Sequence, residues 1–284
     1  MEDCCSTLIV SGGTFFRSHD VANDGMYPDK SYLASVSPFV LDRFEVTVGR
    51  FRKFVEAGTG TQANPPSSGA GARRLNGVDG QGGWDPSWAV GLAVNGAALV
   101  EAVKCDGNLH SWTDVPGANE ALPMNCLTWK EAFAFCVWDG GFLPTEAEWN
   151  FAATGGNEQR AYPWSSPAGT LTIDCSYANY GNNGPPYCVN TPLGSVNHVG
   201  STSPLGDGKF GQSDLAGNVW EWALDFHGAH KIPCDDCANL MTSSTRVLRG
   251  GSLFDAAPFL RSYRHSLAPD SRDFNVGVRC ARTP

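Results

Sequence analysis

Charged residues are scarce in this chain: they make up 17% of its 284 residues, and the formal net charge is −9. No stripe of Lys or Arg interrupts the acidic balance, so nucleic acid is not an expected partner. Long apolar runs are also missing. The run STLIV, residues 6–10, is too short for a signal-peptide core, and no segment approaches the length of a membrane span. We therefore expect the chain as given to be soluble, or to be a mature or trimmed form.

Cysteine is absent from one long stretch, between Cys237 and Cys280, although the chain contains ten cysteines. An even number of cysteines in a Gly- and Pro-rich sequence predicts disulfides and an oxidising location, extracytoplasmic or secreted. Spacing alone leaves the connectivity open. The closest pairs, Cys175 with Cys188 and Cys234 with Cys237, are the most economical assignment.

Hydrophobic residues make up 42% of the chain, which is enough to bury a large core, so we expect one globular domain spanning residues 1–284. Helical periodicity predicts three helices, with N-caps at Thr47, Thr128 and Thr145. Glu131 and Glu148 stand three residues after the last two caps and predict capping boxes. Short strands precede the first helix, and short strands and turns follow the third. A loop-rich insertion is expected at about residues 58–125, because its first part is rich in Gly, Pro and Ser.

The segment FHGAHKIPCDDC allows two interpretations. His227, His230, Cys234 and Cys237 have a spacing that could surround a zinc ion. The alternative is a surface loop closed by a Cys234–Cys237 disulfide, with two ordinary histidines. In an oxidising compartment the disulfide is favoured.

Several long motifs occur in an order that resembles the formylglycine-generating enzyme, or sulfatase-modifying factor, family. The motifs are VSGGTFFR, FEVTVGRFRKFV, LPMNCLTWKEAFAFCVWDGGFLPTEAEWNFAATGG, YPW, DLAGNVWEW, and RVLRGG through NVGVRC. The resemblance spans nearly the whole chain. It implies a mixed α+β, loop-rich fold related to C-type lectins. It also implies a disulfide between Cys136 and Cys280. Cys105 and Cys126 are counted with the expected disulfide cysteines.

The same resemblance implies calcium as a cofactor. In the family, the positions that match DLAGNVWEW coordinate this ion; here they are Asp214, Gly217, Val219 and Glu221. Carboxylates and backbone carbonyls are ligands that Ca²⁺ prefers. The alternative is that Glu221 pairs with an arginine while the neighbouring tryptophans pack. A second family site would use Asn179 and Tyr180, but its remaining ligands have no match.

The family's catalytic chemistry is not expected here. Alignment on RGGS places Asp255 and Leu260 where the enzymes carry two cysteines that bind copper(I). Neither residue can bind a soft ion through sulfur, so copper is not an expected cofactor, and formylglycine generation is not an expected activity.

The segment from Leu253 to Asn275 contains no Lys, Glu, Gln, Met or Trp. This resembles the variable C-terminal region of proteins diversified by retroelements, which display a changeable ligand-binding face. The side chains that we expect to form such a face are Leu253, Phe254, Asp255, Phe259, Tyr263, His265 and Phe274. The competing interpretation is that half of the apolar residues belong to the core.

Two functions therefore remain open. The first is a non-catalytic, calcium-stabilised module that binds a protein or small-molecule ligand. The second is a divergent enzyme of the family, of oxidase or oxygenase type, that does not use the copper-cysteine pair. Its candidate groups are Asp255, His265 and the cluster from His227 to Cys237.

Overall fold

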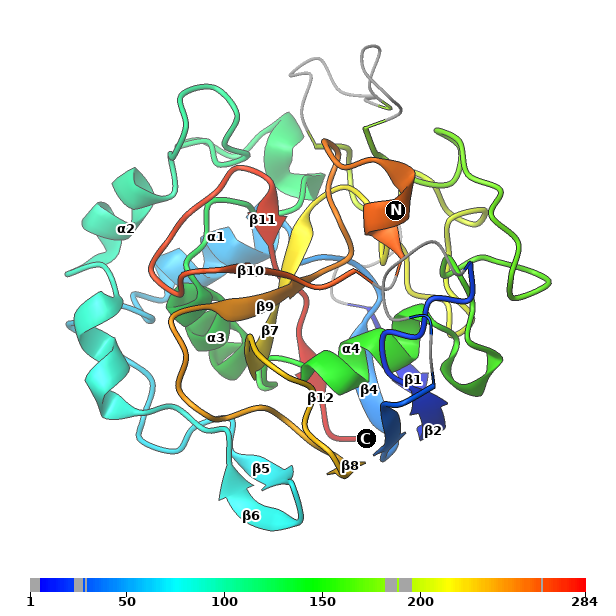
Figure 1. Cartoon of the computed structure of the whole chain (residues 1–284). Helices are drawn as coiled ribbons and strands as arrows, with labels where there is room; N and C mark the ends of the chain where they lie inside the picture. Colours follow the sequence, from blue (N-terminus) through cyan, green and yellow to red (C-terminus); the bar gives the residue numbers. More distant parts are fainter. Residues whose placement is uncertain (1–5, 23–27, 29, 182–187, 189–195, 262) are drawn as a thin grey trace.

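The computed structural model describes residues 6–22, 28, 30–181, 188, 196–261 and 263–284. Short helices and strands joined by long loops form a mixed α/β fold, as the resemblance implied (Figure 1). The strands are β1 (Thr7–Val10), β2 (Gly13–Phe16), β3 (Leu33–Val36), β4 (Phe39–Asp42), β5 (Arg73–Leu75), β6 (Val78–Gln81), β7 (Trp220–Phe226), β8 (Cys234–Asp235), β9 (Arg246–Arg249), β10 (His265–Leu267), β11 (Val276–Gly277) and β12 (Ala281–Arg282). The helices are α1 (Val48–Glu56), α2 (Gly96–Ala102), α3 (Trp129–Trp138) and α4 (Glu146–Ala153). Short 3-10 helices are η1 (Pro86–Gly91), η2 (Ala118–Ala121), η3 (Gly156–Glu158) and η4 (Ala257–Leu260).

The sheet that organises the site has the strand order β10-β9-β7-β11. β9 is antiparallel to β7 and β10, whereas β11 is parallel to β7. The register places Glu221 beside Arg249 and also beside Gly277. Segments far apart in sequence therefore lie side by side at the ends of these strands, which is where loops can form a site.

The three helix starts follow the sequence signals. The Thr47 side chain accepts a hydrogen bond from the backbone of α1. Both reciprocal bonds of a capping box are present at Thr128 with Glu131 and at Thr145 with Glu148. These bonds satisfy backbone N–H groups that a helix start otherwise leaves unpaired. The capping predictions are confirmed.

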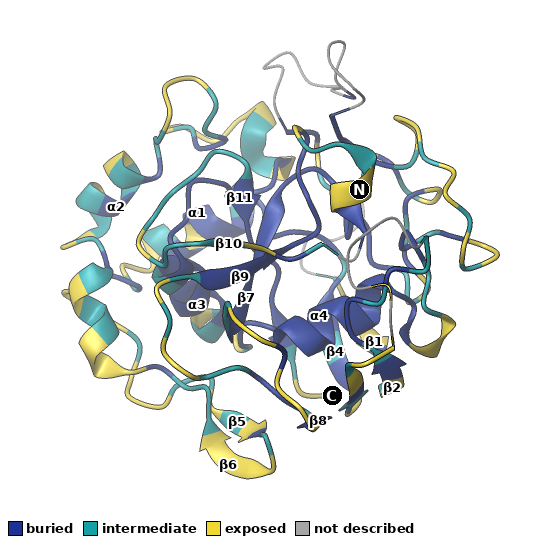
Figure 2. Cartoon of the chain, viewed as in Figure 1, coloured by how far each residue is buried: buried dark blue, intermediate teal, exposed yellow. Residues whose placement is uncertain are grey.

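The main core lies between the β7 sheet and the helices α1 and α3, and Figure 2 shows β7 and β9 as buried. Its members come from both the first third and the last residues of the chain, so the two ends of the sequence share one core. The Cys136–Cys280 disulfide lies inside this cluster and joins α3 to the segment before β12.

Residues 58–125 have more structure than the sequence predicted. They contain the β5–β6 hairpin and α2, neither of which has a strong periodic signal, because α2 is only seven residues long and buries Leu99 alone. Trp84 and Trp112 of this stretch pack into the main core. The hairpin is largely exposed at the edge of the molecule (Figure 2).

Candidate functional site

The tight turn after β9 sets the position of the candidate site. Gly250 and Gly251 both have positive φ, at 99° and 74°. A Cβ atom on Gly251 would lie 2.8 Å from a side-chain carbon of Leu260, so only glycine allows this approach. The turn brings Ser252 and Leu253 into fully buried positions, and the chain reaches the surface from Phe254 onward.

Asp255 lies just beyond this turn and its carboxylate is used locally. Its Oδ2 accepts hydrogen bonds from the backbone N–H of Ser252, at 2.9 Å, and from the Ser252 hydroxyl, at 2.5 Å. Leu260 ends η4 and is almost completely buried, in a cluster with Tyr162 and Tyr180. The two positions that we expect to match the family's catalytic cysteines therefore hold a turn-forming carboxylate and a packed hydrocarbon side chain.

The expected ligand-binding residues form two aromatic pairs. The rings of Phe254 and Phe274 meet edge to face with centroids 5.3 Å apart, and those of Phe259 and Tyr263 meet at 4.8 Å. Phe254 and Phe259 are each 39% exposed. Edge-to-face pairs hold rings rigidly at low entropic cost, which suits a binding surface.

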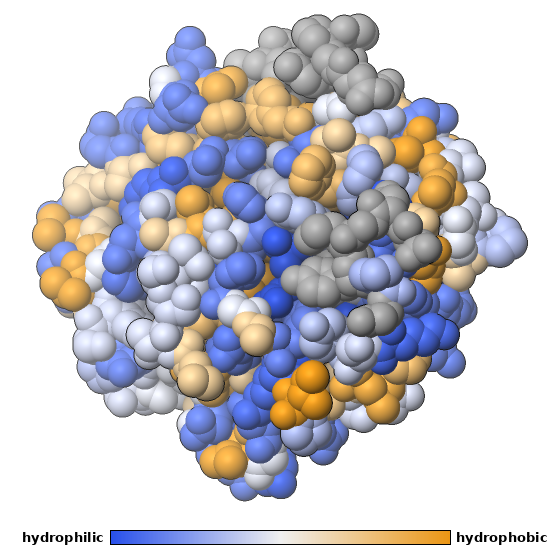
Figure 3. Space-filling model, in the orientation of Figure 1, coloured by the Kyte–Doolittle hydropathy of each residue, from blue (hydrophilic) through white to orange (hydrophobic). Residues whose placement is uncertain are grey.

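Leu253 is not part of this surface. Its exposure was predicted, but the side chain is completely buried in the main core, because the turn points it inward. Its backbone N–H donates to the carbonyl of Asn218. His265 is exposed at the start of β10, with its ring 5.3 Å from that of Trp220. On the side of the molecule drawn in Figure 3, hydrophilic and hydrophobic residues are interspersed.

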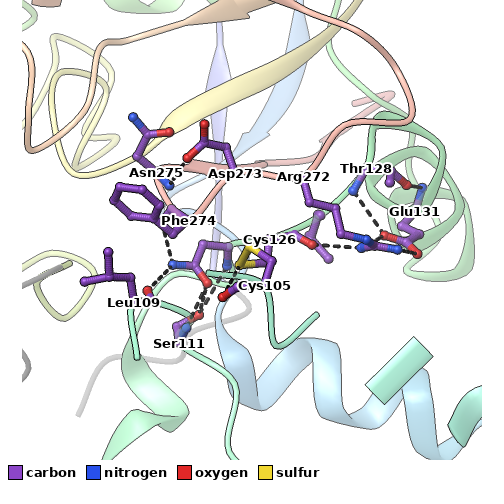
Figure 4. The surroundings of a disulfide bond; sticks show 12 residues. Cys105, Leu109, Ser111, Cys126, Thr128, Glu131, Arg272, Asp273, Phe274 and Asn275 are labelled. Carbon is purple, nitrogen blue, oxygen red and sulfur yellow. Dashed lines mark hydrogen bonds and ion pairs between the residues drawn. A yellow bond between two sulfur atoms is a disulfide. The ribbon is translucent and has the colours of Figure 1, made fainter. Parts of the chain in front are cut away.

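A network around the Cys105–Cys126 disulfide supports the loop that carries Phe274 (Figure 4). Asn125 donates to the carbonyl of Phe274 at 2.6 Å. Arg272 donates to the carbonyl of Cys126 at 2.8 Å and to both carboxylate oxygens of Glu131. The roles of Arg272 and Asn125 were not predicted from the sequence. No local motif indicates them, because each bonds to residues far away in the chain.

The loop between Asp214 and Glu221 is strongly curved. Asp214, Gly217 and Asn218 all have positive φ. A Cβ atom on Gly217 would lie 2.3 Å from the carbonyl oxygen of Asn179, so the expected tight turn through this glycine is present. The N–H of Gly217 donates to the carbonyl of Gly250, which ties this loop to the turn after β9.

Three buried carboxylates meet at this loop. Glu221 accepts from Arg279 at 2.7 to 2.9 Å and from the indole N–H of Trp149 at 2.6 Å, so the arginine partner named in the alternative is present. Glu45, which the sequence analysis missed, accepts from the Asn218 side chain at 2.7 Å. Asp214 accepts from the backbone N–H of Gly200 at 2.5 Å.

The charges at this loop do not balance. Burial, with Asp214 and Glu221 nearby, raises the pKa of Glu45 well above its usual value. Burial is also the main cause that raises the pKa of Asp214 to about 6. Arg279 is the one basic group that opposes both shifts in the described part of the chain. Three carboxylates and one guanidinium give this loop a formal excess of negative charge, which a bound cation would neutralise.

The described residues nevertheless contain no group of three His, Cys, Asp or Glu side chains already arranged to hold a metal ion. A calcium site here would also need backbone carbonyls as ligands. The expected ligand set includes two, those of Gly217 and Val219. Asn179, expected at a second site, is joined to this loop: its side chain donates to that of Asn218 at 3.1 Å, and its carbonyl accepts from the Asn218 backbone. Tyr180 follows it and is buried.

The eight cysteines in the described part of the chain are all in disulfides. The pairs expected at Cys175–Cys188, Cys234–Cys237 and Cys136–Cys280 are confirmed, and Cys105 pairs with Cys126. The zinc interpretation of the His227 to Cys237 cluster fails, because both of its sulfurs are bonded to each other. Cys4 and Cys5 lie outside the described residues. Four disulfides are consistent with an oxidising extracytoplasmic compartment.

No helix in the described ranges has the length and apolar character needed to cross a membrane.

Comparison with known proteins places these features in context. A family model described as sulfatase-modifying factor enzyme 1-like domain matches residues 1–284. The chain is 32% identical to a formylglycine-generating enzyme of Streptomyces coelicolor, over 96% of this chain and 87% of that protein. It is 29% identical to the inactive C-alpha-formylglycine-generating enzyme 2 of Bos taurus, over 96% of this chain and 86% of that protein.

Two solved structures share the fold. PvdO from Pseudomonas aeruginosa aligns with a TM-score of 0.65 and 22% identity, over 100% of this chain and 96% of that one. Treponema denticola variable protein 1 aligns with a TM-score of 0.60 and 19% identity, over 98% of this chain and 95% of that one. At these identities the likeness extends to the fold alone.

Proposed function

The chain belongs to the family of sulfatase-modifying factor enzyme 1-like domains, and we propose that it is a non-catalytic, calcium-stabilised ligand-binding module of that family. One observation carries the proposal. Leu260 fills a packed position where an enzyme of the family has a cysteine, and every cysteine of the described residues is in a disulfide. Copper(I) chemistry needs thiolates, which these residues do not provide.

The binding role rests on the face formed by Phe254, Phe259, Tyr263, His265 and Phe274. Two ring pairs of fixed geometry, partly exposed and backed by a bonded loop, provide contact area that is ordered before a ligand arrives. Variation of the exposed residues within the segment 253–275 would change this face without disturbing the core, because the buried members Leu253 and Leu260 point the other way. The ligand is a protein or a small molecule that meets these rings.

Calcium has a stabilising part in this proposal. Bound at the Asp214–Glu221 loop, it would supply positive charge to three buried carboxylates and take oxygen ligands from Asp214, Glu221 and the carbonyls of Gly217 and Val219. Hydrogen bonds from Gly217 to Gly250 and from Leu253 to Asn218 join that loop to the base of the binding face. An ordered ion site would therefore hold the face in place.

The alternative of a divergent enzyme receives less support. Its proposed zinc centre is removed by the Cys234–Cys237 disulfide. His265 is exposed at the edge of a strand and stacks near Trp220, and Asp255 is engaged with Ser252. Neither group faces a second titratable side chain in a hydrogen bond among the described contacts.

The test is an activity assay with Cu(I) and a sulfatase peptide that contains the target cysteine. This protein should yield no formylglycine, whereas the Streptomyces coelicolor relative serves as the positive control. The double variant Asp255→Cys, Leu260→Cys should bind Cu(I) tightly, and the matched variant Asp255→Ser, Leu260→Ser should not, because only thiolates bind this soft ion strongly.

Turnover of the peptide by the unmodified protein would show that it is an enzyme and would overturn the proposal. A folded double-cysteine variant that fails to bind Cu(I) would show that Asp255 and Leu260 do not occupy the catalytic positions. Far-ultraviolet circular dichroism of each variant establishes that it is folded.

A further inference from the structure

A second group of charges lies around Glu146, the first residue of α4. Arg249 bonds to one oxygen of this carboxylate, Arg17 lies 3.5 Å from the other, and Arg264 approaches at 3.9 Å. All four side chains are at most 3% exposed. Burial opposes the ionisation of Glu146, yet these guanidiniums hold its pKa below the usual range. Three buried cations thus share one carboxylate at close range.

A second carboxylate, Asp225, does not balance the group. Asp225 accepts from the backbone N–H groups of Glu146 and Asn239. Burial, followed by repulsion from Glu146, raises its pKa to about 6. Arg246, buried beside it, is sandwiched against aromatic rings, with its guanidinium 3.4 Å from the ring centre of Phe226.

In the described ranges this region therefore has four arginines, at positions 17, 246, 249 and 264, for two carboxylates. A formal excess of positive charge inside a protein is costly unless an anion approaches it.

A cavity of about 650 Å³ borders this group. Its wall includes residues 227–232, which follow β7, and residues 238–243, which precede β9 (Figure 1). Two of the arginines hold this wall from behind: Arg264 donates to the carbonyl of Gly228 at 3.0 Å, and Arg17 donates to the carbonyl of Lys231 at 2.5 Å. Their charge is thus fixed directly behind the lining of the cavity.

Two histidines of the lining, His227 and His230, lie close to this group of charges. The Nδ1 atom of His230 lies 3.8 Å from Glu146. Burial, together with the charges of Arg264, Arg17 and Arg249, lowers its pKa to about 3, although Glu146 opposes the shift. Burial and then Arg264 also lower the pKa of His227. Burial is the first cause of both shifts, and the charge of Arg264, which would attract an anion, acts in the same direction on both histidines.

The open side of the cavity adds one more cation and an apolar rim. Lys231 is exposed at the edge. Ile232 is 63% exposed and Met241 is 81% exposed, and Leu240 packs between them and the core. A positively charged interior with an apolar rim matches a ligand that has a charged end and a short hydrocarbon part.

We propose that this cavity binds a small molecule through an oxyanion group, a carboxylate or a phosphate, with its apolar part against Ile232, Leu240 and Met241. The site is separate from the aromatic face, which lies after the turn at Ser252, so it stands or falls independently of the function proposed above.

The test follows the histidine ring signals of the full chain by NMR during titration with butyrate, acetate, inorganic phosphate and the neutral analogue butyramide. We expect the signals of His227 and His230 to move with an anion and not with butyramide, while those of His110 and His198 stay in place. Tighter binding of butyrate than of acetate and phosphate identifies a carboxylate with an apolar part, and tighter binding of phosphate identifies a phosphate head group.

Lys231→Glu reverses the charge at the rim of the cavity and should weaken binding about tenfold at low ionic strength. The matched control is Lys53→Glu, an exposed charge reversal on α1, which should bind as the unmodified protein does. Arg264→Gln keeps a donor for the Gly228 carbonyl but removes a charge, so it should weaken binding further where it remains folded.

The proposal is wrong if no anion moves the two histidine signals. It is also wrong if Lys231→Glu and Lys53→Glu bind anions equally well, because binding would then follow net charge and not the cavity. These outcomes do not depend on Arg264→Gln being stable.

Discussion

Arg279 shows how strongly single residues determine this structure. It is fully buried, donates to both oxygens of Glu221, and also donates to the backbone carbonyls of Asp42, Arg43 and Ser213. One side chain thus joins the curved loop, β4 and the last strands. A guanidinium can do this because it presents five donors in a plane.

At this scale the sequence allowed some residues to be placed but not others. Glu221 could be identified because it lies in a motif, and its arginine partner was foreseen as an alternative. Glu45 could not, because it lies far from the motif in sequence and reaches it only through the fold. Leu253 was predicted to be exposed because composition does not reveal the direction of a turn.

Arg272 offers a prediction for one ion pair. Arg272→Met should lower the free energy of unfolding by about 3 kcal/mol, because it leaves the buried carboxylate of Glu131 without its cation. Arg74→Met, which breaks the exposed pair with Asp79, should change it by less than about 1 kcal/mol. Urea unfolding measures both, and equal effects would contradict the importance assigned to the Arg272 pair.

Among the elements, the helices were the most predictable and the loops the least. Caps at Thr128 and Thr145 depend on neighbours three residues away, so a sequence shows them directly. α2 escaped prediction because seven residues contain too few turns for a periodic pattern. The curved loop before β7 was expected to turn at Gly217. The contact of this region with Glu45, and the identity of its arginine partner as Arg279, were not expected, because those residues lie far away in the sequence.

The curved loop carries a prediction that couples pH to calcium. A carboxyl whose folded pKa is raised binds its proton more tightly in the folded state, so its contribution to stability falls as pH rises through that range. For Asp214 the range runs from the ordinary value of 3.8 to about 6, and Glu45 shifts in the same direction. In EDTA, the stabilisation by Asp214 and Glu45 should therefore decline as pH rises across that range, and the melting temperature should fall with it. Calcium should restore the melting temperature.

The control is Asp225, whose raised pKa gives the same pH trend but lies away from the loop. The trend from Asp225 should remain with calcium present, and the variant Asp214→Asn should lose most of the calcium effect. Identical melting curves in EDTA and calcium across the range, with no calcium found by elemental analysis, would remove the ion from the proposed function.

Over the whole molecule, one core and four disulfides hold loops that have little regular structure. The even cysteine count and the short spacings identified two pairs, and the family resemblance identified the long-range pair. The Cys105–Cys126 pairing remained open, since nothing in the spacing shows that the segment after α2 and the segment before α3 meet there. Packing of residues 84–112 into the core could likewise not be predicted, because the composition of this stretch suggested an insertion.

The disulfides predict a graded loss of stability. Cys136→Ser with Cys280→Ser should lower the free energy of unfolding by about 2 to 4 kcal/mol, because this bond restricts a loop of 144 residues in the unfolded chain. Cys234→Ser with Cys237→Ser should lower the free energy of unfolding by less, because that disulfide has a sequence separation of only 3. Thiol labelling of the unmodified protein, denatured without a reducing agent, should find at most two free cysteines. Eight free thiols would contradict the disulfide framework.

The long disulfide also closes a covalent ring, with a sequence separation of 144 in a chain of 284 residues. The ring contains the curved loop, the aromatic face and the segments 227–232 and 238–243 that line the charged cavity. A single cut by an extracellular protease in any exposed loop of that ring would open it without releasing a fragment, so both ends would stay attached to the same core. Such a scaffold can carry long, changeable surface loops and still survive damage to one of them.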